Sequence, residues 1–97
     1  MKLTPFSRYK ISGHSMEPTL KNGQVVWVNN WPYLINKIRV GDIVIFEQDG
    51  KELIKRVAKI NGKSVSLMGD NRSDSLDSRT FGEVNIEKIS GKIITNK

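Results

Sequence analysis

Short β-prone runs, interrupted every few residues by turn signals, limit this chain to a sheet-rich fold. Residues 24–29 and 43–48 are rich in β-branched and aromatic side chains, which suit a pleated, half-buried surface. The dipeptides Asp49-Gly50 and Asn61-Gly62 tolerate positive φ, so each is predicted to close a two-residue hairpin. The two hairpins would join residues 43–48, 51–60 and 63–68 into a meander.

The rest of the chain adds little regular structure to this meander. Residues 69–79 carry almost no apolar side chains and are predicted to form a long polar loop, and loops of that length are often functional. Residues 83–89 favour a short helix, and residues 91–95 a closing strand. With 97 residues, the chain is expected to form one domain, residues 1–97, that is mostly β with little helix.

Composition excludes several classes of site and segment. Cysteine is absent and only one histidine is present, which leaves no disulfide, no thiolate chemistry and too few ligands for an ordinary zinc site. Asp70 in the polar loop could begin a calcium-binding loop, but the residues that follow do not fit one. Arg72, Ser75 and Phe81 stand at positions where such a loop needs other residue types. No metal is therefore expected. No apolar run approaches the roughly 20 residues of a membrane-spanning helix.

The chain is basic, with a formal net charge of +6. This charge favours an anionic partner, either an acidic membrane surface or nucleic acid. The lysines are scattered along the chain rather than gathered with stacking aromatic residues, so nucleic acid is not the expected partner. An anionic membrane surface stays open, beside a merely solvated basic surface.

Ser15 lies in a turn-forming segment between Gly13 and Pro18. Such a turn can present a serine hydroxyl, and the backbone N–H groups around it can form an oxyanion hole. Serines in turns of this kind are also common in ordinary loops, where they hydrogen-bond locally. The segment alone therefore leaves a catalytic role and a structural role open.

A catalytic serine needs a general base, for which the chain offers His14 or a lysine. The His14 side chain diverges from that of the adjacent Ser15 and is the poorer proton acceptor. Strand alternation places Lys55 on one face with Leu53 and Val57. Apolar neighbours lower the pKa of a lysine amine toward the range in which it can accept a proton. The alternative is a lysine that reaches solvent from a strand edge.

Four segments together resemble the type I signal peptidase family. Residues 12–20 (SGHSMEPTL) are similar to its nucleophile segment and residues 39–46 (RVGDIVIF) to its core-strand segment. Residues 53–60 (LIKRVAKI) resemble the segment with the lysine base, and residues 69–84 (GDNRSDSLDSRTFGEV) the last and most distinctive segment. The four occur in the family's order, and the resemblance implies a small barrel-like β fold of the signal peptidase catalytic core.

The resemblance also implies roles for individual residues. Ser15 would attack the scissile carbonyl while neutral Lys55 takes its proton, and the Ser15 backbone N–H would line the oxyanion hole. Ser75 would orient the lysine amine. The remaining roles implied are substrate binding by Met16 and bracing of the polar loop by Asp77 and Arg79. No cofactor is needed. The substrate would be a protein with an N-terminal leader or signal peptide, bound as an extended strand with small residues next to the cut and two residues before it.

Three departures from the family pattern widen the choice of substrate. Gly13 stands where many members have a serine that contributes to the oxyanion hole, no inserted β-domain follows residue 62, and no anchor segment is present. This compact form is similar to the nickel superoxide dismutase maturation proteases, and would be cytoplasmic if the chain is complete. The alternative is a catalytic fragment of an anchored type I signal peptidase, membrane-associated with an extracytoplasmic catalytic domain.

Two more distant alternatives come from other classes. A LexA-type self-cleaving domain shares Ser/Lys chemistry and a small β fold, but lacks the GDN and DSR signatures of residues 69–79. A basic β-barrel could bind nucleic acid by stacking bases on Trp27, Trp31 and Tyr33. Such binding would be strongly salt-dependent and would survive loss of Ser15.

Overall fold

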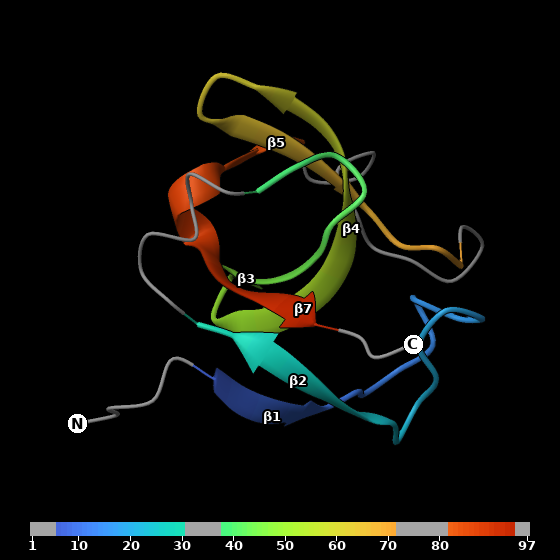
Figure 1. The fold of residues 1–97 in the computed structure, drawn as a ribbon. Helices are drawn as coiled ribbons and strands as arrows, with labels where there is room; N and C mark the ends of the chain where they lie inside the picture. Colours follow the sequence, from blue (N-terminus) through green and yellow to red (C-terminus); the bar gives the residue numbers. More distant parts are fainter. Residues whose placement is uncertain (1–5, 31–37, 72–81, 95–97) are drawn as a thin grey trace.

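The computed structural model describes residues 6–30, 38–71 and 82–94 (Figure 1). Its regular elements, in chain order, are the strands β1 (Phe6–Lys10), β2 (Val25–Asn29), β3 (Ile43–Gln48), β4 (Lys51–Asn61), β5 (Ser64–Met68) and β6 (Val84–Asn85), the short 3-10 helix η3 (Ile86–Lys88) and the strand β7 (Ile89–Ile94). The described chain is thus mostly β with little helix, as predicted.

All seven strands belong to one antiparallel sheet. Their order is β1-β2-β7-β3-β4-β5-β6, so the C-terminal strand β7 is inserted between β2 and β3. Figure 1 shows the sheet curving strongly, with β4 bending along its length. Within the described residues the outer strands β1 and β6 do not pair with each other, so the sheet is open rather than a closed barrel.

The two predicted hairpins are both present, one of them displaced. Asp49 and Gly50 form the two-residue turn between β3 and β4, with φ of 53° and 79°, as predicted from their tolerance of positive φ. In the second hairpin Asn61 pairs with Ser64, so the turn residues are Gly62 and Lys63 instead of Asn61 and Gly62. The strand ladder extends one residue further than the turn signal indicated.

The short helix predicted within residues 83–89 is present over only part of that range. Only Ile86–Lys88 is helical, as one 3-10 turn, and Asn85 caps it by accepting a hydrogen bond from the Glu87 N–H. Val84 precedes this turn as part of β6 and pairs with Val65 of β5. Pairing with a buried strand therefore overrides the local helical pattern. The predicted strand over residues 91–95 is present as β7 up to Ile94, and residue 95 lies outside the described residues.

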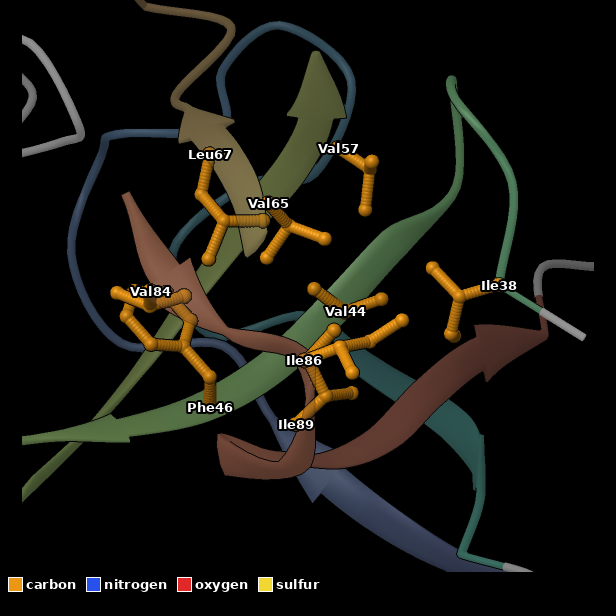
Figure 2. Packing of buried hydrophobic residues seen from close by; sticks show 9 residues of the cluster. All are labelled: Ile38, Val44, Phe46, Val57, Val65, Leu67, Val84, Ile86 and Ile89. Carbon is orange, nitrogen blue, oxygen red and sulfur yellow. The ribbon is translucent and has the colours of Figure 1, made fainter. Parts of the chain in front are cut away.

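Apolar side chains gather in two clusters on opposite sides of the sheet. The first core cluster consists of Ile38, Val44, Phe46, Val57, Val65, Leu67, Val84, Ile86 and Ile89 (Figure 2). The second core cluster consists of Ile11, Met16, Leu20, Val26, Val28, Ile43, Ile45, Ile54 and Ile93. Val44 and Ile45 are consecutive in β3 and fall in different clusters, because alternate residues of a strand point to opposite faces.

Gly91 of β7 lies where a side chain would collide with Val28 of β2 and with Asn30. A Cβ atom at this position would lie 2.5 Å from Val28 Cγ1 and 2.9 Å from Asn30 Nδ2. Val28 is 1% exposed and belongs to the second core cluster, so its side chain has little room to move aside. A residue without a side chain is required here to let β7 enter the sheet.

In the part of the chain that the structure describes, no helix is long and apolar enough to cross a membrane.

Candidate active site

Ser15 lies in the connection between β1 and β2, which forms a series of turns. Two apolar side chains fasten this connection to the second core cluster, since Met16 and Leu20 are each 1% exposed. A backbone hydrogen bond from the Leu20 N–H to the Met16 carbonyl, 2.9 Å long, joins the same two residues. Ser15 itself is only partly buried. The loop therefore holds a serine near the surface on a firmly anchored backbone.

Met16 and His14 are two further residues of this loop for which the sequence suggested roles. The Met16 side chain contacts the core, and its role in substrate binding stays a prediction. His14 places its Nδ1 atom 2.7 Å from a carboxylate oxygen of Glu17, and its side chain is 56% exposed. This hydrogen bond is the main cause that lowers the pKa of Glu17. His14 is thus engaged with a carboxylate, in agreement with its low ranking as the base for Ser15.

Lys55 is the one buried charged residue in the described ranges, at 3% exposure. It lies in β4 directly opposite Val44 of β3, which is fully buried in the first core cluster. Leu53 and Val57, two residues to either side of Lys55, also pack in or against that cluster. The predicted apolar face is therefore present, and the solvated alternative for Lys55 is excluded. Burial of this kind disfavours the charged form of an amine.

The described residues include no hydrogen bond between the Ser15 hydroxyl and the Lys55 amine. A network centred on Asp70 instead connects the Ser15 loop to β4. Arg56, the residue after Lys55, donates from Nε and Nη2 to the two carboxylate oxygens of Asp70 at 2.9 and 2.7 Å. The Thr19 hydroxyl, at the far end of the Ser15 loop, donates to the same carboxylate.

Arg56 has a third contact that extends this network to the segment before β3. Its Nη1 atom donates to the Gly41 carbonyl at 2.7 Å. The hydrogen bonds to Asp70 are the main cause that raises the pKa of Arg56, which keeps the guanidinium charged. A two-pronged pair of this geometry fixes orientation as well as distance. The Ser15 loop, β4 and the segment before β3 are therefore fixed relative to one another.

Asn71 contacts the backbone of the Ser15 loop at two successive carbonyl groups. Its side-chain Nδ2 donates to the His14 carbonyl at 3.0 Å, and its backbone N–H donates to the Ser15 carbonyl at 2.7 Å. The start of the predicted polar loop thus lies directly against the serine. The sequence marked Asp70 and Asn71 only as part of the family-like segment 69–84, and no local pattern indicated these long-range contacts.

Ser75, Asp77 and Arg79 lie outside the described residues, and their predicted roles stay predictions. The described part of the chain holds no group of three or more histidine, cysteine, aspartate or glutamate side chains arranged to bind a metal. The structure thus connects the anchored loop that carries Ser15 to the strand that carries the buried Lys55, through hydrogen bonds of Arg56, Asp70 and Asn71.

Comparison with known proteins gives one consistent family. The family model described as signal peptidase, peptidase S26, matches residues 1–67 and 59–96. Signal peptidase I of Bacillus caldolyticus is 31% identical over 109 residues, covering 95% of this chain and 60% of that protein. Signal peptidase I V of Bacillus subtilis is 37% identical over 71 residues, covering 72% of this chain and 42% of that protein.

A eukaryotic relative extends the similarity. Mitochondrial inner membrane protease subunit 1 of Xenopus tropicalis is 31% identical over 105 residues, covering 84% of this chain and 63% of that protein. The chain thus spans about 60% or less of the length of the bacterial relatives it matches.

The Arg56–Asp70 pair predicts a specific loss of stability. Arg56→Lys keeps the positive charge but removes the two-pronged pairing and the contact to Gly41, and we expect it to lower the free energy of unfolding by about 1–2 kcal/mol. Urea unfolding followed by circular dichroism measures this change. The matched control is Arg39→Lys, an exposed position expected to change stability by less than about 0.5 kcal/mol. Equal stability of the two variants would show that the network does not brace the loop.

Proposed function

Since the chain belongs to the signal peptidase family, peptidase S26, we propose that it is a serine endopeptidase that removes an N-terminal leader or signal peptide, with Ser15 as nucleophile and Lys55 as general base. The family match supports the reaction class. The observation that carries the assignment of the base is the burial of Lys55 at 3% exposure, on a face shared with Val44 and Val57.

Burial gives Lys55 the property that a base requires. A solvated ammonium holds its proton at neutral pH and cannot accept another. Desolvation raises the free energy of the charged form relative to the neutral amine and so lowers the pKa of a lysine. The neighbouring Arg56 cannot take this role, because a guanidinium does not lose its proton.

In the proposed acylation, the Lys55 amine takes the proton from the Ser15 hydroxyl as Oγ bonds to the scissile carbonyl carbon. The carbonyl π electrons move to the oxygen, giving a tetrahedral oxyanion, which the Ser15 backbone N–H stabilises. When the intermediate collapses, the C–N bond breaks and the leaving amine receives the proton from Lys55. The products of this stage are an acyl-enzyme and the mature N-terminus of the substrate.

Deacylation repeats the same steps with water. Neutral Lys55 takes a proton from a water molecule, whose oxygen attacks the ester carbon, and the second intermediate collapses by returning Ser15 Oγ as leaving group with the proton from Lys55. Ser75 is proposed to orient the lysine amine, and Asp77 and Arg79 to brace their loop. The reaction requires no cofactor.

We expect Ser15→Ala to abolish cleavage of a peptide with alanine next to the scissile bond and two residues before it, because no hydroxyl remains to form the acyl-enzyme. Cleavage is measured by mass spectrometry, and folding by circular dichroism. Ser12→Ala, an exposed serine of the same loop, is the matched control and should retain activity. Turnover by the Ser15→Ala variant would refute the proposed nucleophile.

The second prediction concerns the base. The rate should rise with pH along an acidic limb, because Lys55 accepts the serine proton only after it has lost its own. Lys55→Arg should be as inactive as Lys55→Ala, since arginine stays protonated. Lys59→Arg, an exposed lysine of the same strand, should keep wild-type activity. Substantial cleavage by the Lys55→Arg variant would assign the base to another residue.

The exposed surface of the sheet favours an anionic membrane as the setting of this reaction. On β1, β2 and β7, four large apolar side chains are exposed: Phe6 at 45%, Val25 at 55%, Trp27 at 50% and Ile94 at 39%. Arg8 pairs with Trp27 across the strands, and Lys10 with Val25. The Arg8 guanidinium lies 5.9 Å from the centre of a Trp27 ring. The three strands carry no acidic residue.

Exposed apolar side chains beside basic ones complement an anionic lipid surface, where aromatic rings settle at the headgroup level and basic side chains meet phosphates. Contact with lipid distinguishes between the two proposed kinds of substrate. A nickel superoxide dismutase leader would be cleaved without lipid, whereas a secretory preprotein would be cleaved at the bilayer. The exposed apolar and basic side chains of β1, β2 and β7 support a secretory preprotein as the substrate.

We therefore expect the protein to bind vesicles that contain phosphatidylglycerol, and to bind pure phosphatidylcholine vesicles much more weakly. Arg8→Gln should weaken binding to the anionic vesicles by about fivefold, equivalent to roughly 1 kcal/mol for one basic residue. Trp27→Ser should also weaken it, by loss of apolar contact. Val40→Ser, at an exposed apolar position outside these strands, is the control. Vesicle co-sedimentation measures binding, and equal binding to both kinds of vesicle would refute the proposal.

A further inference from the structure

Asn71 holds the peptide unit that supplies the oxyanion donor, and we propose that it is a positioning residue for the oxyanion hole. The inference rests on the proposed function, in which the Ser15 N–H stabilises the tetrahedral intermediate. In this proposal Asn71 acts only through the backbone of the Ser15 loop, where it contacts two successive carbonyl groups.

The geometry follows from the planarity of the peptide bond. The His14 carbonyl and the Ser15 N–H belong to one planar trans unit, so they point in opposite directions. Asn71 Nδ2 donates to this carbonyl at 3.0 Å and thereby sets the direction of the N–H on the other side. A rotation of the unit would turn the N–H away from the developing oxyanion and break this hydrogen bond.

The next peptide unit is fixed from the same side. The Asn71 backbone N–H donates to the Ser15 carbonyl at 2.7 Å, which directs the Met16 N–H away from Asn71 as well. Within the described residues the N–H groups of Ser15 and Met16 have no hydrogen-bond acceptor. Asn71 therefore holds two successive carbonyls on one side of the loop and leaves two N–H groups directed to the other.

The other hydrogen bonds of the loop fix the direction of the Ser15 N–H less firmly than the Asn71 side chain does. The His14 carbonyl also accepts from the Glu17 N–H, at a longer distance of 3.2 Å within the turn itself. Asn22 braces the loop through the Gly13 N–H, which belongs to a different peptide unit. Because a preorganised donor contributes only when it is aimed at the oxyanion, loss of the Asn71 amide should lower kcat more than it raises KM.

Asn71→Asp tests this, because it keeps the size and the backbone N–H but replaces the donor by an oxygen that repels the His14 carbonyl. We expect kcat for the alanine-containing peptide to fall by about 10- to 100-fold, with KM changed by less than about threefold. A peptide aldehyde, which forms a tetrahedral adduct with the serine, should lose affinity by the same factor as kcat/KM. The corresponding peptide alcohol, which forms no adduct, should bind as before.

Asn22→Ala is the matched control, since it removes an asparagine contact to the same loop without touching the peptide unit of Ser15, and it should keep kcat within about threefold. If Asn71→Asp does not fold, Asn71→Ser provides the same measurements with the donor shortened. The inference is overturned if the Asn71 variant retains kcat while Ser15→Ala is inactive, or if aldehyde and alcohol lose affinity equally. Turnover by Ser15→Ala would overturn the proposed function instead.

Discussion

Burial of both faces of β4 is the constraint on which the other features of this structure depend. This strand of 11 residues pairs with β3 along one edge and with β5 along the other. Ile54 packs in the second core cluster and Val57 in the first, so each face is covered by apolar side chains. Lys55 lies opposite Val44 on the face of the first core cluster and is buried for this reason, whereas Arg56 on the other face remains part-exposed.

The same alternation separates two basic side chains that are adjacent in the chain. Lys55 points toward the first core cluster, and Arg56 points to the opposite face, where Asp70 receives it. A buried charge is costly unless it is paired, whereas a half-exposed ion pair is tolerated at little cost. One strand thus holds a desolvated side chain, which we propose as the general base, beside a charged guanidinium that fastens the Ser15 loop. Reversal of the two residues would place the permanent charge in the core.

The sequence predicted those parts of the fold that local chemistry determines. The Asp49-Gly50 turn was correct because both residues adopt positive φ, and the apolar face around Lys55 was correct because strand alternation is a local rule. The short helix predicted within residues 83–89 is confined to Ile86–Lys88, since Val84 pairs with Val65, a partner remote in the chain. The second turn was displaced because pairing of Asn61 with Ser64 extended the ladder.

The contacts around the candidate active site could not be predicted in the same way. Arg56 and Asp70 are 14 residues apart, and Asn71 and His14 are 57 residues apart. No pattern of period 2 or 3.6 connects positions at such separations. The family resemblance marked the segments that meet, but which atom donates to which carbonyl follows only from the folded chain.

Strand register relates the proposed lipid-binding face to the proposed base. Trp27 of β2 lies opposite Ile94 of β7, and Lys92, two residues before Ile94, lies opposite Val44 of β3. Val44 in turn lies opposite Lys55 of β4. Residues directly opposite share a face, as do alternate residues of one strand, so the exposed apolar side chains and the buried lysine belong to the same side of the sheet.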